Sequence, residues 1–313
     1  MAVVQTGIAN SIDASSGRAR LDAVAKKLIR HKIILAEILK ECVEEFRSYD
    51  VNYIEKYCFV GDIRMDEVSV DQDVPDAEAS VIGSDTEDSS DREGTVRYDL
   101  VFDAQVPETG ELIRLIINVE IQVDMEPGYP LITRAIYYLG RLISRQKGTV
   151  FKKSDYGKIR KVYSIWICPD PKRENMNSIA EYGFVQQKVI GQVNEPVENY
   201  DKMKAIIISL NDEGMENRTE IIRLLSTLLS VKQPVDKRKQ ILEEEFNIPM
   251  TREIEEEVSE MCNLGMAVET MGKEEMLLSN IRSLMETLKL TAEQAMDALK
   301  IPKVDQEKYQ KKL

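Results

Sequence analysis

Apolar residues recur along both ends of the chain with the period of a helix. Between residues 21 and 46 they return at steps of three and four, which predicts an amphipathic helix that buries one side. Residues 1–20 are small and polar, and we expect a flexible N-terminus there. Further helices are expected at 220–231, 236–246, 252–262, 273–288 and 292–299.

The middle of the chain has the pattern of strands. Residues 95–106 and 111–123 are rich in β-branched residues and flank the turn formers Pro107 to Gly110, which predicts a β-hairpin. Pro130 precedes a segment with helical spacing, 131–146. Later strands are expected at 161–167, 184–193 and 204–210.

These elements predict an α/β fold with a mixed central sheet of four or more strands flanked by helices. The predicted sheet domain spans residues 21–210, and a helical C-terminal region spans 211–313. Six apolar residues of that region could form either an internal core or the seam of a homodimer. They are Leu224, Leu225, Leu228, Leu229, Leu242 and Phe246.

Composition narrows the chemistry. The chain has 55 acids and 42 bases, and its net charge of −13 argues against indiscriminate coating of nucleic acid or anionic membrane. Without a run of about 18 apolar residues or a signal-peptide pattern, we expect a cytoplasmic protein with no membrane contact. The four cysteines are scattered and the only histidine, His31, is expected on the surface, which disfavours zinc modules, disulfide scaffolds and histidine-based triads.

Charge is also segregated along the chain. Residues 66–93 hold eleven acids and one base and are expected to form a solvated excursion, whereas residues 141–173 hold ten bases and two acids. One face of the predicted helix and the segment after it could follow a DNA backbone through Arg134, Tyr138, Arg141, Arg145, Lys147, Lys152 and Lys153. The arginines could equally pair with the acidic excursion, which would then act as a gate over a basic groove.

The hairpin carries the candidate chemistry. A turn centred between residues 108 and 109 sets Asp99 opposite Asn118, with Glu120 and Gln122 on the same face. Two carboxylates on adjacent strands can share Mg²⁺ or Mn²⁺, and a backbone carbonyl such as that of Ile121 can complete the ligand set. The pattern alone also fits an ordinary exposed hairpin face.

The residues around this pair resemble the PD-(D/E)XK nuclease superfamily in their order: helix, Asp99, hairpin, Glu120-Ile121-Gln122, helix, strand. The segments EGTVRYDLVF, INVEIQ, PGYPLITRAIYYLGRLISRQ and KVYSIWIC are similar to the branch of PD-(D/E)XK family transposases, or recombination-promoting nucleases. The resemblance covers residues 25–210. It implies that Asp99 and Glu120 bind the metal, and that Gln122 replaces a lysine that positions the nucleophilic water.

The resemblance implies a metal-dependent DNA endonuclease. An acid on the first helix often joins such sites, and Glu44 or Glu45 is the candidate here. Gln122 can orient water by hydrogen bonding but supplies no positive charge. The alternative is therefore a nuclease-fold protein that binds DNA or a protein partner with weak cutting or none.

Overall fold

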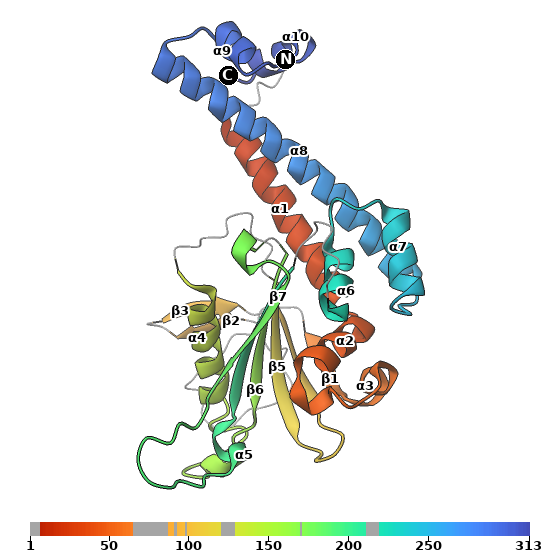
Figure 1. Ribbon diagram of the computed structural model, residues 1–313, viewed down its shortest axis with the longest axis vertical. Coiled ribbons are helices and arrows are strands. Elements are labelled where there is room, and N and C mark those ends of the chain that lie inside the picture. Colours follow the sequence, from red (N-terminus) through yellow and green to blue (C-terminus); the bar gives the residue numbers. More distant parts are fainter. Residues whose placement is uncertain are drawn as a thin grey trace.

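A six-stranded mixed sheet forms the centre of the protein, and helices cover both of its faces (Figure 1). The structure is a computed structural model that describes residues 7–64, 87–90, 93–97, 99–119, 129–169, 171–210 and 219–313. Together these elements make an α/β fold, as predicted.

The strand order is β1-β4-β5-β6-β8-β7. Strands β1, β4 and β5 form an antiparallel meander, β6 and β8 run parallel to β5, and β7 is antiparallel to β8. A separate two-stranded sheet pairs β2 with β3. The bounds are β1 (Phe59–Arg64), β2 (Glu87–Ser90), β3 (Glu93–Arg97), β4 (Leu100–Gln105), β5 (Leu112–Val119), β6 (Val162–Cys168), β7 (Ser178–Gly183) and β8 (Met203–Ser209).

The register of the central hairpin is confirmed. Leu100 of β4 lies opposite Ile117 of β5. One further residue along the same register brings Asp99 beside Asn118, the predicted pair, because antiparallel partners advance one residue at a time in opposite directions. The hairpin is also central in the sheet, since β1 pairs with β4 on one side and β6 pairs with β5 on the other.

The helices surround this sheet. Their bounds are α1 (Gly7–Ile29), α2 (Lys32–Cys42), η1 (Glu44–Phe46), α3 (Val51–Tyr57), α4 (Leu131–Ser144), η2 (Tyr156–Lys158), η3 (Arg173–Asn175), α5 (Val197–Tyr200), α6 (Glu220–Leu229), α7 (Val235–Glu244), α8 (Arg252–Leu288), α9 (Ala292–Ala298) and α10 (Lys303–Gln310).

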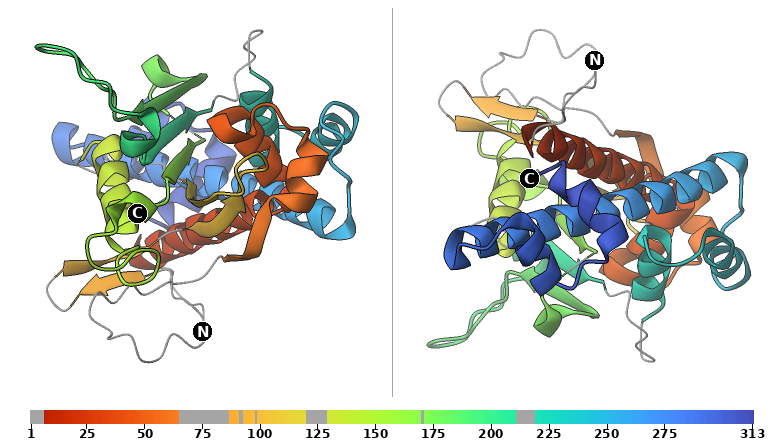
Figure 2. Two further views of the ribbon diagram at one scale, coloured as in Figure 1. Left: turned by 90° about the horizontal axis from the view of Figure 1, so that it is seen from below. Right: turned by 90° about the horizontal axis from the view of Figure 1, so that it is seen from above.

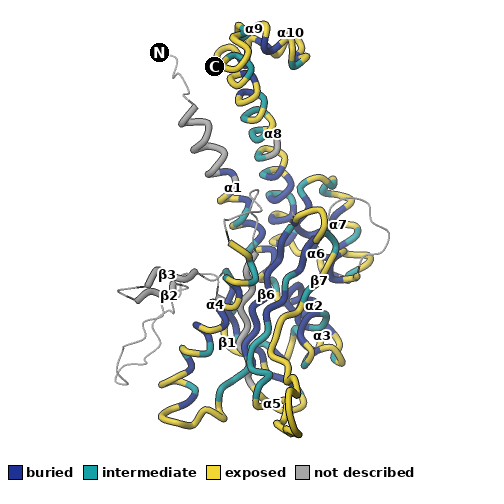
Figure 3. The backbone as a smooth tube through the Cα atoms, turned by 60° about the vertical axis from the view of Figure 1, so that its left-hand side comes forward, coloured by how far each residue is buried: buried dark blue, intermediate teal, exposed yellow. Residues whose placement is uncertain are grey.

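Each face of the sheet has its own core. On one face α1, α2 and α6 bury a large apolar cluster with residues such as Tyr163 and Ile165 of β6. On the other face α4 packs Tyr138 and Leu139 against Trp166. Strand β6 is buried along its whole length because helices cover both of its faces (Figure 3).

Two long helices extend the molecule beyond the sheet. Helix α1 packs along α8, and the two lie side by side in each view (Figures 1 and 2). At the far end of α8, helices α9 and α10 close a third, small apolar cluster around Ile281 and Met296. Within the described residues, no helix is both long and apolar enough to cross a bilayer.

The predicted leucine set of the C-terminal region belongs to the core of the sheet. Its five leucines are buried in the same cluster as residues of β6, and Phe246 packs against that cluster. These leucines are Leu224, Leu225, Leu228, Leu229 and Leu242. Of the two alternatives, the structure shows the internal core. Buried Arg238 fixes this arrangement by donating to the carbonyl oxygens of Thr227 at 2.9 Å and Val258 at 3.3 Å.

Several helix predictions were wrong. Helix α1 already begins at Gly7, within the segment expected to be flexible. The single helix predicted over 21–46 is broken between Ile29 and Lys32, because the chain turns there to lay α2 on the sheet while the apolar spacing continues without interruption. Helix α8 joins the two predicted helices 252–262 and 273–288, and α10 was not predicted.

One strand prediction was also wrong. Residues 184–193 form an exposed loop, and the edge of the sheet is filled by β7, which pairs with β8 instead. The β-branched content of 184–193 favoured a strand, but pairing in a sheet depends on a free neighbouring edge as well as on composition.

Most of the acidic excursion at 66–93 lies outside the described residues, apart from the short strands β2 and β3.

Candidate functional site

Asp99 lies at the end of the sheet where β4 begins and β5 ends. Its side chain is 19% exposed, and its Oδ1 lies 2.7 Å from the Nζ of Lys26. Glu120, Ile121 and Gln122 follow directly after β5 and lie outside the described residues. The structure therefore describes one of the two predicted metal ligands, Asp99, and not the other.

Helix α1 brings a lysine and a second carboxylate to Asp99. Lys26 Nζ also lies 2.6 Å from the Oδ2 of Asp22, one turn earlier on α1. Burial lowers the pKa of Lys26, but attraction to Asp99 and hydrogen bonds to both carboxylates outweigh it, so the pKa is raised overall. Leu21, Ala25 and Leu28 anchor this turn of α1 in the core.

Arg134 lies at the same level of the sheet as Asp99, because its guanidinium stacks on Trp166, the neighbour of Asn118 in β6. The guanidinium carbon lies 5.2 Å from the ring centre of Trp166 and 5.2 Å from that of Tyr138. Arg134 also donates to the hydroxyl oxygens of Tyr138 at 2.9 Å and Tyr129 at 3.3 Å. These contacts hold a half-buried guanidinium on the side of the sheet that α4 covers.

The other residues expected to bind DNA are distributed along α4 and beyond it. Tyr138 and Arg141 are buried on the side of α4 that faces the sheet, and Arg145 is half-buried beyond them. Lys147, Lys152 and Lys153 are exposed. They follow the C-terminal end of α4, about 20 Å from its first turn at 1.5 Å per residue. The predicted helix face is thus turned inward, and the exposed charge is at the far end.

Glu44 and Glu45 lie at the opposite end of the sheet from Asp99. Glu45 Oε1 is 2.7 Å from the Nζ of Lys161, which directly precedes β6. Lys161 is five residues from Trp166, about 16 Å along an extended strand. The structure therefore does not bring the predicted accessory acids to Asp99, and the helix acid that does lie there is Asp22.

The cluster around Glu45 is densely connected. Lys161 also pairs with Asp201, and Tyr163 donates from its hydroxyl to the Oε2 of Glu45 at 2.6 Å. Burial and the neighbouring charge of Glu45 raise the pKa of Tyr163, so it stays protonated. Lys204 joins the cluster through Glu181 at 2.7 Å. A cleft of about 710 Å³ opens beside it, lined by Glu45, Lys161 and Asp201 among others.

His31 is half-buried rather than exposed, in contrast to the sequence expectation. Its Nε2 lies 2.7 Å from the Oε2 of Glu257, and Glu253 lies one turn away on α8. Single donor atoms of these three residues all lie within 4.8 Å of one another, so the group could hold a metal ion. Imidazole suits Zn²⁺ better than Mg²⁺, and the group contains none of the residues predicted for the hairpin site.

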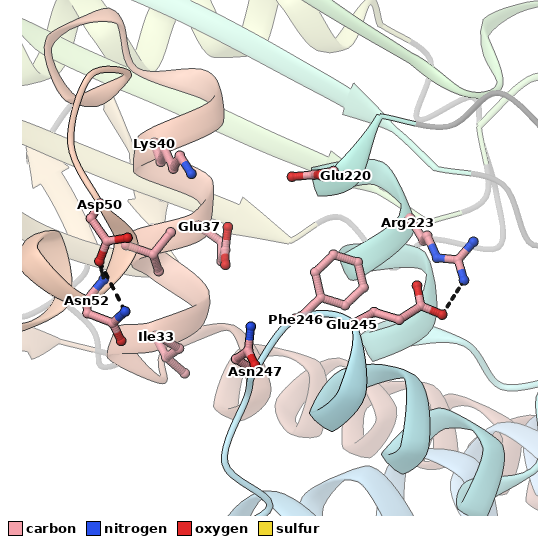
Figure 4. Close-up of a pocket in the computed structure, with 11 residues that line it drawn as sticks. Ile33, Glu37, Lys40, Asp50, Asn52, Glu220, Arg223, Glu245, Phe246 and Asn247 are labelled. Carbon is pink, nitrogen blue, oxygen red and sulfur yellow. Dashed lines mark hydrogen bonds and ion pairs between the residues drawn. The ribbon is translucent and has the colours of Figure 1, made fainter.

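A second pocket, of about 470 Å³, lies between α2, α3, α6 and α7 (Figure 4). Glu37 and Glu220 lie on opposite sides of it, and Arg223 pairs with Glu245 at 2.5 Å. Burial raises the pKa of Glu37. Asp99, the predicted metal ligand that the structure describes, is not among the residues that line this pocket.

Two residues of the Asp99 environment were missed by the sequence reasoning. Asp22 and Lys26 are spaced i, i+4 within a stripe of buried apolar residues, and that spacing was the available signal.

The chain matches no protein-family model, and neither a curated protein nor a solved structure is detectably similar to it.

Proposed function

We propose that this protein is a metal-dependent DNA endonuclease with a PD-(D/E)XK core. The proposal depends chiefly on the register of β4 and β5, which sets Asp99 beside Asn118, two residues before Glu120. The order of α1, the β4–β5 hairpin, α4 and β6 is also the order that the sequence resemblance implies. Asp99 thereby lies near the end of β5, the strand that directly precedes Glu120 in the sequence.

The donor chemistry of this end of the sheet fits a hard divalent cation. Asp99 and Asp22 offer carboxylate oxygens on either side of one ammonium group, and Mg²⁺ and Mn²⁺ prefer oxygen ligands. Asp99, Glu120 and the carbonyl oxygen of Ile121 would hold the ion. When bound, such an ion lowers the pKa of water and offsets the charge of a phosphodiester. Gln122 would orient the attacking water through a hydrogen bond.

Nicking of supercoiled plasmid tests the activity. Wild type should nick in Mg²⁺ or Mn²⁺ but not in EDTA, and Asp99→Asn and Glu120→Gln should lose at least about 10²-fold in rate because each removes ligand charge. Glu45→Gln is the matched control from the opposite end of the sheet and should retain the wild-type rate. Equal nicking by all four proteins, or nicking in EDTA, would assign the cutting to a contaminant and favour a non-cutting DNA-binding protein.

Exposed lysines beyond α4 provide the expected contact with DNA. Alanine at Lys147, Lys152 and Lys153 together should weaken DNA binding and reduce the salt dependence, by about 0.9 in the slope of log affinity against log salt for each lost phosphate contact. Fluorescence anisotropy at several salt concentrations measures this slope. Alanine at the exposed Lys232, Lys237 and Lys300 removes the same charge elsewhere and should have a smaller effect. An equal effect would move the DNA site away from α4.

A further inference from the structure

Lys26 occupies a position between two carboxylates at the end of the sheet. It lies 2.6 Å from Asp22 and 2.7 Å from Asp99, and its side chain is 23% exposed. The adjacent residue, Lys27, is exposed on the same helix. Helix α1 therefore delivers one specific ammonium group to the predicted metal ligand.

A nuclease of the proposed kind needs positive charge near the scissile phosphate. Negative charge accumulates on phosphate oxygens as water attacks, and a fixed cation in a site that excludes water stabilises it strongly. At the third position of the motif Gln122 contributes only hydrogen bonds. Beyond the charge of the bound ion, a positive charge at this site would then come from a residue outside the motif.

We propose that Lys26 supplies this charge from helix α1, as a catalytic residue that contacts the scissile phosphate beside Asp99. The inference rests on the proposed nuclease function. Asp22 is a positioning residue, because its carboxylate holds the Lys26 ammonium at the level of Asp99.

Other cations near the sheet fit this role less well. Arg134 stacks on Tyr138 and Trp166 on the side of the sheet that α4 covers, whereas the Nζ of Lys26 lies 2.7 Å from the Oδ1 of Asp99. Lys161 is at the opposite end of the sheet, between Glu45 and Asp201. Among the described lysines, Lys26 is the one paired with Asp99.

The position of Lys26 has a consequence that a purely structural lysine lacks. Its ammonium and a divalent cation are both attracted to the Asp99 carboxylate, so the two compete through like-charge repulsion. Removing Lys26 should therefore strengthen divalent binding while it slows cleavage. A lysine that only maintained the shape of the site would weaken both together on removal.

The test combines Mn²⁺ calorimetry, thermal unfolding and plasmid nicking on the full chain. Lys26→Ala should nick about 10²-fold more slowly, the loss expected for one charge-stabilising group, and should bind Mn²⁺ about threefold more tightly. Lys26→Arg should keep at least a tenth of the rate. Lys27→Ala removes the same charge one residue away and should match wild type in all three measurements.

A rescue distinguishes charge from shape. Adding Gln122→Lys to Lys26→Ala returns an ammonium group to the motif. The double variant should nick at least tenfold faster than Lys26→Ala alone. If Lys26→Ala fails to fold, Asp22→Asn provides the test, since it removes the charge of one of the two carboxylates that hold Lys26 and should lower the rate about tenfold.

The two possible failures are distinguishable. If wild type nicks in a metal-dependent way and Lys26→Ala nicks equally fast, the role of Lys26 is overturned and the nuclease function stands. Weaker Mn²⁺ binding in Lys26→Ala, with a matching loss of rate, would make Lys26 a structural residue. If wild type shows no metal-dependent nicking, the nuclease function and the role of Lys26 both fall.

Discussion

The two ends of the central sheet carry similar arrangements of charge. At one end Lys26 lies between Asp22 and Asp99, and at the other Lys161 lies between Glu45 and Asp201. In both, a lysine lies between two carboxylates, at least one of which comes from a distant part of the chain. A lysine flanked by two acids is thus insufficient to identify a functional site in this fold.

The surroundings of the two clusters differ. Around Glu45, Tyr163 donates a further hydrogen bond and Lys204 adds a second ammonium, with its Nζ 3.6 Å from Glu44 and 2.7 Å from Glu181. These contacts link η1 to β6, β7 and β8. At the other end, β5 ends at Val119, and Glu120 is the next residue of the chain. We interpret the Glu45 cluster as structural and the Asp99 cluster as the metal-binding one.

Removing the central lysine of each cluster should give the largest difference. Lys161→Met leaves Glu45 and Asp201 half-buried without their ammonium partner and should lower the free energy of unfolding by about 2 kcal/mol, below the range for fully buried pairs. Lys26→Met should cost about 1 kcal/mol because Asp22 is more exposed. Urea unfolding measures both values.

Mn²⁺ should change the stability of the two lysine variants differently. It should restore stability to Lys26→Met, since a bound cation replaces the lost charge, and should leave Lys161→Met unchanged. Restoration of Lys161→Met alone would exchange the roles of the two clusters.

The hydroxyl of Tyr163 should matter for stability alone. Tyr163→Phe removes a hydrogen bond to a charged carboxylate and should cost about 1 kcal/mol of unfolding free energy, because the rest of the ring stays packed. The rate of plasmid nicking should not change. A loss of nicking without a loss of stability would give the Glu45 end a catalytic role.

Alkaline pH should weaken the Glu45 cluster through Lys204. Burial lowers the pKa of Lys204, but the hydrogen bond to Glu181 and the charge of Asp201 raise it further, so it lies above its ordinary value of 10.5. A raised pKa in the folded state stabilises the fold below the unfolded pKa, and this contribution is lost as pH rises through the folded value. The stability difference between wild type and Lys204→Met should be constant near neutral pH and shrink above about pH 10.5.

The hairpin register was predictable from sequence because it depends on local features. The turn formers Pro107 to Gly110 and the period of two fixed the pairing of Asp99 with Asn118, and the β4–β5 register agrees. The helical spacing after Pro130 gave α4 for the same reason.

The partners of Asp99 were not predictable in this way. Lys26 reaches Asp99 across more than 70 residues of chain, and the predicted helix over 21–46 directed attention to Glu44 and Glu45 instead. Which end of a sheet a helix residue meets depends on where the helix breaks. The break after Ile29 leaves no interruption in the apolar spacing, so the sequence pattern does not reveal it.

We expect the divalent metal to bind at the Asp99 end of the sheet. Isothermal calorimetry with Mn²⁺ tests it most directly on three proteins: wild type, Asp99→Ala and Glu45→Ala. We expect one site in wild type, loss of that site in Asp99→Ala, and unchanged affinity in Glu45→Ala. Unchanged binding in Asp99→Ala, or loss of binding in Glu45→Ala with Asp99 intact, would contradict it.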